Sequence, residues 1–341
     1  MSELGEHHPL DERKDEILRE IVESYIRGGE PVGSKAVADS TDLGVSSATI
    51  RNEMAILERE GYINHPHTSA GRVPTDKAYR YYVDVLAPRV ASDPGRRRTI
   101  EGSLAGAVSA LDELLDRASQ LLSELTDYTS LASPPALSES RLQRLELVRL
   151  GGSRLLLVCV GQDGWHEERL VEMESEVSDD ALGRALKIAN TVAEGSAPVQ
   201  AASAIEESRA PAEVEPVLRA LSRGLHTIAA STGRLYTGGT SKLVMWEPLG
   251  AAQRVLEMLD ARGVEPLLPH ADPNAVTVRI GKEFALEELR DLSLIAAGYR
   301  FGRSAGTLGV LGPTRMDYPV VMSTVAEVAS TLSRILRQLG P

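Results

Sequence analysis

Residues 46–63 read SSATIRNEMAILEREGYI, and this stretch decides the fold of the N-terminal part of the chain. Serine is a preferred residue at the start of a helix, so Ser46 or Ser47 is the expected N-cap and Gly61 is the expected stop. Between them, apolar residues recur at helical spacing and form one stripe, which consists of Ile50, Met54 and Leu57. The stretch therefore predicts an amphipathic helix with one face in a core and the other face free.

Two further helices and a hairpin are predicted on either side of this helix. Apolar residues at helical spacing predict a helix over residues 11–27, and a short second helix is predicted to follow Ser34 as its N-cap. After the third helix, residues 62–64, a turn-rich patch over 65–71 and residues 72–75 predict a small hairpin. Three helices followed by a hairpin are typical of a winged helix-turn-helix domain, which binds DNA.

The outer face of the third helix carries the side chains that such a domain needs. Arginine bonds guanine through two hydrogen bonds and asparagine bonds adenine, so Arg51 and Asn52 are suited to the major groove. Small residues, hydroxyls and one arginine suit the hairpin to a phosphate backbone. The alternatives are a solvated helix face and an ordinary turn, but helix and hairpin together favour DNA. The candidate DNA-contacting residues are Ser34, Lys35, Ser46, Ser47, Thr49, Arg51, Asn52, His67, Thr68, Ser69, Arg72 and Thr75.

The charge of the chain bears on this hypothesis because DNA is a polyanion. The whole chain has a net charge of −12, and residues 1–86 hold 10 Lys and Arg against 16 Asp and Glu. The acidic residues are concentrated on the first predicted helix, whereas residues 61–82 carry three basic residues and one acidic residue. We therefore expect DNA binding to be focused by geometry rather than by a general positive field.

Beyond a hinge marked by Pro88, Pro94 and Gly95, the pattern alternates between helix and sheet. A long amphipathic helix is predicted over residues 99–131. The other expected elements are strands over 145–150, 155–161 and 165–173, helices within 178–235, a helix over 251–262, strands over 276–280, 292–299 and 307–311, and a helix over 324–339. This order predicts an α+β domain interrupted by a helical insertion.

Several classes of protein are excluded by the sequence. No apolar run reaches the ~18 residues of a membrane span, and the polar, acidic N-terminus is not a signal peptide. The lone Cys159 lies in an apolar run, forms no intrachain disulfide and is interpreted as a buried strand residue. These features predict a reduced, cytoplasmic protein.

An enzyme is also not indicated. No Ser/His/Asp set or carboxylate pair stands out, and residues 238–242 lack the frame of a phosphate-binding P-loop. Turns and close backbone packing explain the glycine-rich stretches better. His65 and His67 have no cysteine or acidic partner at ligand spacing. We therefore expect no enzyme activity, no metal and no cofactor.

Six runs of the chain are similar to one protein family. In the N-terminal part they are PVGSKAVAD (31–39), SSATIRNEMAILEREGYI (46–63) and PHTSAGRVPTDKAYRYYVD (66–84). Further along they are YTGGTSKL (236–243), VRIG (278–281) and GTLGVLGPTRMDY (306–318). On these runs the chain resembles the heat-inducible transcription repressor family HrcA. The resemblance spans nearly the whole chain and is weakest over residues 176–235.

The resemblance implies an α+β protein of three parts. These are a winged helix-turn-helix domain over residues 1–88, a linker helix and GAF-like domain over 89–175 and 236–341, and a helical dimerising segment inserted over 176–235. The resemblance also implies a homodimer that represses chaperone operons by binding a double-stranded DNA operator, the inverted repeat CIRCE. A GroEL-type chaperonin is the implied partner that keeps the repressor competent to bind.

Two other functions stay open at this point. The DNA-binding domain is compatible with a GAF-like domain that senses a small molecule, since such folds often hold ligands, although fold alone does not give function. A ligand that raises the melting temperature would favour this sensor. An enzyme that uses the glycine-rich stretches is the third possibility, and turnover that depends on Lys242 would favour it.

Overall fold

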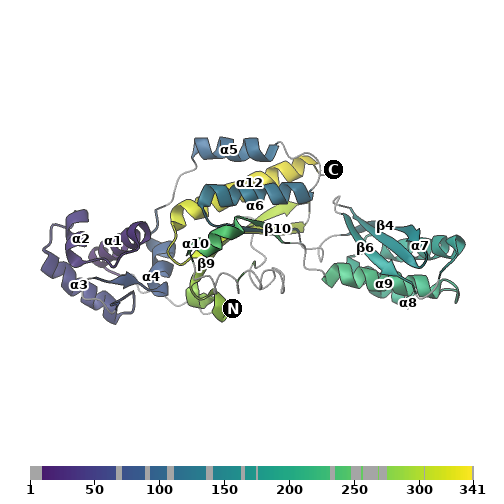
Figure 1. Cartoon of the computed structure of the whole chain (residues 1–341), viewed down its shortest axis with the longest axis horizontal. Coiled ribbons are helices and arrows are strands. Elements are labelled where there is room, and N and C mark those ends of the chain that lie inside the picture. Colours follow the sequence, from purple (N-terminus) through teal and green to yellow (C-terminus); the bar gives the residue numbers. More distant parts are fainter. Residues whose placement is uncertain are drawn as a thin grey trace.

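The protein is built from three units that follow one another along its long axis (Figure 1). The computed structural model describes residues 10–66, 71–88, 93–105, 111–135, 141–162, 166–173, 176–230, 235–246, 275–302 and 304–339, with residues 255 and 268. A small helical unit lies at one end, an α+β unit lies in the middle, and a second sheet with helices lies at the other end. Within these ranges, no helix is both long and apolar enough to cross a membrane.

The first unit is the winged helix-turn-helix head that the sequence predicts. It comprises α1 (Glu12–Gly28), α2 (Ser34–Ser40), α3 (Ser47–Arg59), β1 (Ile63–Asn64), β2 (Val73–Pro74), α4 (Asp76–Tyr81) and the π-helical turn η1 (Tyr82–Leu86). The side chain of Asp11 caps α1 by accepting from the Lys14 amide at 3.0 Å. Helix α1 ends at Gly29, whose φ of 72° is left-handed and favours glycine.

The helices of the head are held together by one apolar core. The stripe predicted on α3 is buried, and it packs with the apolar face of α1. The residues concerned are Ile17, Leu18, Ile21, Ile50, Met54 and Leu57, all less than 5% exposed. Burial of this stripe leaves only the opposite face of α3 accessible to a ligand.

The middle unit is organised by a five-stranded antiparallel sheet of order β7-β3-β10-β9-β8. Its strands are β3 (Thr129–Ser133), β7 (Tyr236–Gly238), β8 (Val276–Ile280), β9 (Leu292–Phe301) and β10 (Ser304–Pro313). The helices α6 (Leu111–Thr126) and α12 (Tyr318–Leu339) pack beside the sheet, and α5 (Pro94–Ala105) lies on their outer side (Figure 1). Short helical turns complete the unit, namely η2 (Thr240–Lys242), α10 (Leu243–Trp246), η3 (Gly281–Glu283) and η4 (Glu287–Leu289).

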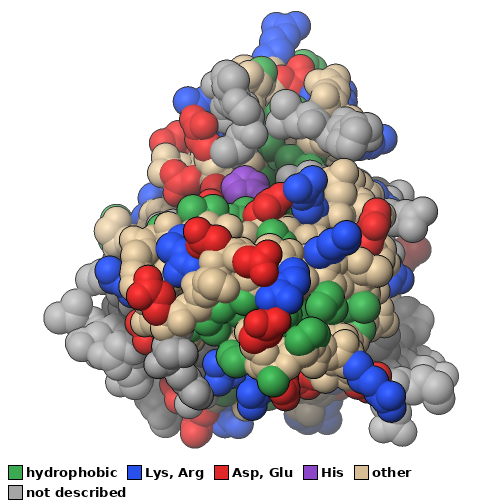
Figure 2. Space-filling model, turned by 90° about the vertical axis from the view of Figure 1, so that its right-hand side faces the viewer, with side chains coloured by type: hydrophobic (Ala, Val, Ile, Leu, Met, Phe, Trp, Pro, Cys, Tyr) green, Lys and Arg blue, Asp and Glu red, His purple; other side chains and the backbone are tan. Residues whose placement is uncertain are grey.

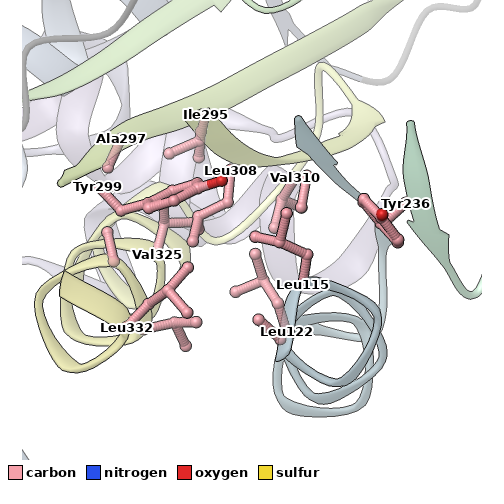
Figure 3. Close-up of a cluster of buried hydrophobic side chains, with 14 of the residues drawn as sticks. Leu115, Leu122, Tyr236, Ile295, Ala297, Tyr299, Leu308, Val310, Val325 and Leu332 are labelled. Atoms are coloured by element: carbon pink, nitrogen blue, oxygen red, sulfur yellow. The ribbon is translucent and has the colours of Figure 1, made fainter. Parts of the chain in front are cut away.

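Both faces of the five-stranded sheet are buried. On one face, Ile295 and Ala297 of β9 pack with Leu308, Val310 and residues of α6 and α12 (Figure 3). On the other face, Leu294 and Ala296 belong to a second core with Leu311 and Phe284. The alternation along β9 follows the period of two of a β-strand. A strand buried on both faces reads as a continuous apolar run, as residues 294–297 do.

The third unit has its own sheet. It comprises β4 (Leu142–Gly151), β5 (Arg154–Gly161) and β6 (His166–Glu172) in the order β4-β5-β6, with α7 (Asp179–Ala193), α8 (Pro198–Glu207) and α9 (Glu215–Ala230). Asn190 of α7 ties helix to sheet, because it accepts from the Leu145 amide at 2.7 Å and donates to the Leu145 carbonyl at 2.9 Å. Helix α9 approaches the sheet closely at Gly224, where a Cβ would press against Leu157. We call residues 141–230 the inserted unit.

The boundaries of this insertion differ from the expected range of 176–235. The strands β3 and β7 that flank it are neighbours, since Ala132 is the Cα partner of Tyr236. The chain thus leaves and re-enters the middle unit at adjacent points. Over the described residues, β4, β5 and β6 form a sheet of their own and do not pair with the five-stranded sheet. The strand pattern in the sequence is correct, but it does not reveal to which sheet each strand belongs.

Two further helices are expected from the sequence, over residues 99–131 and 251–262. The single helix predicted over 99–131 is wrong, because α5 and α6 are separate and residues 129–133 form β3. Helix α6 stops at Asp127, which adopts a left-handed φ of 61°, and Thr129 starts the strand. The helix predicted over 251–262 lies outside the described residues, apart from residue 255.

Candidate DNA-binding interface

The free face of α3 presents the two side chains chosen for base recognition. Arg51 and Asn52 are exposed, and within the described ranges neither side chain makes a hydrogen bond or an ion pair. Ala48 and Ala55 flank them on the same face and are also exposed. Small neighbours leave both long side chains room to reach a base edge. Helix α3 is rigidly backed by the core, so the direction of this face is set by the fold.

The N-terminus of α3 is suited to a phosphate. Ser46 caps the helix by accepting from the Thr49 amide at 3.2 Å, and its hydroxyl lies 3.1 Å from that of Thr49. Ser47, the first helical residue, is exposed. Unpaired amides and the positive end of the helix dipole attract anions at such a terminus. Ser46 and Thr49 therefore hold the helix start, while Ser47 is free to contact DNA.

The accessible positive charge of the head is concentrated on α2 and α3. Lys35, Arg51 and Arg59 are exposed and have no acidic partner within the described part of the chain. Five other basic residues of the head are ion-paired, namely Arg13 with Glu53, Lys14 with Asp11, Arg27 with Glu20, Arg72 with Glu58 and Arg80 with Glu283. Exposed Lys77 on α4 instead donates to the backbone carbonyl of Glu60 at 2.8 Å. In the described part of this net negative head, three exposed cations without an acidic partner thus lie on the helix-turn-helix. Sequence reasoning missed Arg59, whose spacing of seven residues from Asn52 places both on one helix face.

The hairpin residues have structural contacts of their own. Nε of Arg72 donates to Oε2 of Glu58 at 2.9 Å, which ties the hairpin to α3. The Thr75 hydroxyl donates to the carbonyls of Gly61 and Tyr62 at 2.7 and 3.0 Å and accepts from the first turn of α4. Ser34 is the first residue of α2, whereas Gly33 is its N-cap, so the predicted cap is one residue too late. The remaining three candidates, His67, Thr68 and Ser69, lie outside the described residues.

Comparison with known families agrees with this geometry. Residues 9–84 match the model described as "Winged helix-turn-helix transcription repressor, HrcA DNA-binding", and residues 112–322 match "HrcA protein C terminal domain". The two matches together cover most of the chain. The chain belongs to the HrcA family. The resemblance seen in the six sequence runs is thereby confirmed.

Relatives in this family are similar over nearly their whole length. The heat-inducible transcription repressor HrcA of Thermobifida fusca is 41% identical, over 98% of this chain and 99% of its own. The HrcA of Arthrobacter sp. is 42% identical, over 95% of this chain and 98% of its own. A crystal structure described only as a hypothetical protein is 23% identical, has a TM-score of 0.65, and covers 97% of this chain and 100% of its own. That likeness supports the fold.

Membership of HrcA assigns the general activity. This chain is a transcription repressor with a winged helix-turn-helix DNA-binding domain, and the family is not an enzyme class. The exposed face of α3 is therefore the candidate reading surface of an HrcA repressor.

The hairpin arginine gives a first test of how the head contacts DNA outside the exposed face of α3. We expect Arg72→Ala to weaken binding to operator and to random DNA by similar factors, with a salt slope lower by about one unit, because a phosphate contact carries no sequence information. Glu58→Gln is the matched control, since it frees the guanidinium and should strengthen binding to random DNA. Titrations at several salt concentrations measure both. A loss confined to operator would place Arg72 at a base edge instead.

Proposed function

We propose that this chain represses chaperone operons by binding an inverted-repeat operator as a homodimer, and that its activity depends on a GroEL-type chaperonin. The observation that carries the DNA part is a pair of exposed side chains on α3, Arg51 and Asn52, which have no partner among the residues that the structure describes. The relatives are named heat-inducible repressors, which supports the link to heat-shock genes. The site of action of such a repressor is the bacterial cytoplasm.

A dimer is proposed because one head offers little binding energy. A single recognition helix reads only a few base pairs, and the net charge of −12 opposes non-specific binding. When two heads are linked, binding of the second head to its half-site becomes an intramolecular step, which raises the overall affinity by about 10²- to 10⁴-fold. An inverted repeat is the DNA that matches a two-fold symmetric protein.

The inserted unit is the proposed dimer contact. On the face of its sheet turned away from the helices, Val148 lies beside Leu156, and Leu156 lies beside Leu170. Val148 and Leu170 at the two ends of this row are 48% and 50% exposed. In the view of the end of the molecule that carries this unit, hydrophobic patches lie among charged side chains (Figure 2). An exposed apolar row on an open sheet face is suited to burial against a second copy.

The sensor alternative has less support. The space between the five-stranded sheet and the helices α6 and α12 is occupied by side chains such as Leu115, Leu122, Tyr299 and Val325 (Figure 3). Tyr299 packs directly over Gly306 of the neighbouring strand β10. A ligand in this layer would have to displace a packed core. The GAF-like assignment of this unit stays a prediction.

The proposal is tested on promoter DNA of the chaperone operons from the source organism. We expect footprinting to show protection of both halves of an inverted repeat, and added chaperonin to increase that protection at equal repressor concentration. The same fragment with one half-site scrambled is the control. Equal protection of the scrambled fragment would refute binding as a dimer, and no effect of chaperonin would refute the dependence on it.

A further inference from the structure

Helix α4 joins the head to the middle unit. On one side, α4 and η1 pack against α1: the Tyr81 hydroxyl donates to Asp15 at 2.8 Å and the Tyr82 hydroxyl donates to Glu23 at 3.2 Å. The other side of α4 presents Asp76, Tyr79 and Arg80 to the middle unit. The head is thus docked on the middle unit, and residues 71–88 do not merely tether it.

The polar part of this contact is centred on Arg80. Its guanidinium bonds both carboxylate oxygens of Glu283, at 2.8 Å from Nε and 2.5 Å from Nη2, and Nη2 also donates to the Val278 carbonyl at 2.7 Å. Paired bonds between arginine and carboxylate fix orientation as well as distance. The backbone amide of Lys282 donates to Asp76 at 3.1 Å. Gly281, with φ of 50°, lies so close that a Cβ would collide with the Asp76 carboxylate.

The apolar part of the contact is a buried pair of tyrosine rings. The rings of Tyr79 and Tyr318 lie with centroids 5.8 Å apart, and both residues are buried. The Tyr318 hydroxyl fixes the position of its ring, because it lies 2.8 Å from the Ser293 hydroxyl and donates to the Thr314 carbonyl at 2.7 Å. An aromatic pair that is buried and anchored on one side resists sliding.

A third contact comes from the loop that precedes α12. The guanidinium of Arg315 lies against Gly29 at the end of α1, where a Cβ would collide with it. A cation at the C-terminus of a helix is favoured by the helix dipole. We call the set Asp76, Tyr79 and Arg80 with Glu283, Arg315 and Tyr318 the seat. Arg315 and Tyr318 lie in the run 306–318 that is similar to the family, and Glu283 lies two residues after the run 278–281.

We infer that the seat is a positioning device for operator recognition, which sets the direction of α3 and hence the half-site spacing that the repressor accepts. Glu283, Arg315 and Tyr318 are positioning residues, because they lie against α1 and α4 and not on the exposed face of α3. The inference rests on the proposed binding of an inverted repeat by two heads. A head that pivots has a lower effective concentration at the second half-site. Both the affinity for the operator and the selectivity for one spacer length should therefore fall.

The test uses the full-length chain and a series of inverted repeats that differ only in spacer length. Wild type should show one preferred spacing and should bind an isolated half-site weakly. Glu283→Gln keeps the side-chain volume and removes the charge that holds Arg80. We expect it to lose about tenfold in affinity at the preferred spacing, to bind a wider range of spacings, and to bind the half-site as wild type does. Glu287→Gln is the control, since Glu287 pairs with exposed Arg290 in the same unit.

A thermodynamic cycle separates positioning from folding. If Arg80 and Glu283 act together, the variant with both changed to alanine should lose no more operator affinity than either single variant. Arg315→Gln should reproduce the wider spacing preference through an independent contact. An unchanged spacing profile in Glu283→Gln and Arg315→Gln overturns the inference, as does an equal loss on the half-site. A wild type that does not prefer the repeat to the half-site refutes the proposed function, and the inference with it.

Discussion

Removal of the inserted unit should give a folded monomer whose affinity for the operator is lower by about a hundredfold or more. The topology makes the deletion feasible: β3 and β7 pair at Ala132 and Tyr236, so a short glycine-serine linker can replace residues 136–234. The five-stranded sheet contains no strand of the inserted unit among the described residues, and the core on its Leu294–Ala296 face includes no residue of that unit, so we expect the sheet to fold without it. Light scattering gives the mass, and titration with operator and with a single half-site gives the loss of avidity.

A point variant provides the control for this deletion. Leu170→Lys places a charge at one end of the exposed row Val148–Leu156–Leu170, and it should yield a monomer without loss of folding because Leu170 is half exposed. Val199→Lys on α8 is the matched change, at a residue equally exposed outside this row. We expect the Val199 variant to remain dimeric. A deletion protein that is still dimeric would place the contact in the long helices or in the five-stranded sheet.

The head could be predicted from sequence because its signals are local. The Ser46 cap, the stripe Ile50–Met54–Leu57 and the stop at Gly61 lie within one helix, and each is present in the structure. Strand β3 gave no such signal. Residues 129–133 are a short run at the end of a strongly periodic helix, and four of the five are buried, so no alternation marks them as a strand.

Contacts between distant segments could not be predicted either. The pair Arg72–Glu58 spans 14 residues and the pair Arg80–Glu283 spans 203, so neither follows from local spacing. The boundary of the inserted unit depends on the pairing of β3 with β7, which are about a hundred residues apart in the chain. The candidate site was therefore predictable on α3, where periodicity alone orients the side chains. In the hairpin, Arg72 bonds Glu58 and Thr75 bonds the Gly61 carbonyl, and local sequence spacing does not reveal these contacts.

The recognition face itself should give the second large effect. Arg51→Ala and Asn52→Ala should each cost about 1–3 kcal/mol of operator binding, or roughly 5- to 150-fold, if each side chain reads a base edge. Neither change should unfold the head, because both side chains are exposed and make no bond within the described ranges. Leu57→Ala on the buried side of the same helix should instead destabilise the head by roughly 2–5 kcal/mol.

A loss of operator affinity can come from a lost base contact or from a lost phosphate contact, and only the first lowers sequence specificity. Arg59→Ala removes an exposed cation, without an acidic partner in the described part of the chain, from the far end of α3. The change should therefore weaken binding to operator and to random DNA alike. Arg51→Ala and Asn52→Ala should instead lower the ratio between operator and random DNA, and each should relax the preference at one base pair of the half-site. Titration of each variant against operators with single base-pair changes measures this directly. If both variants retain the ratio of wild type, α3 does not read the operator, and the assignment of this face is wrong.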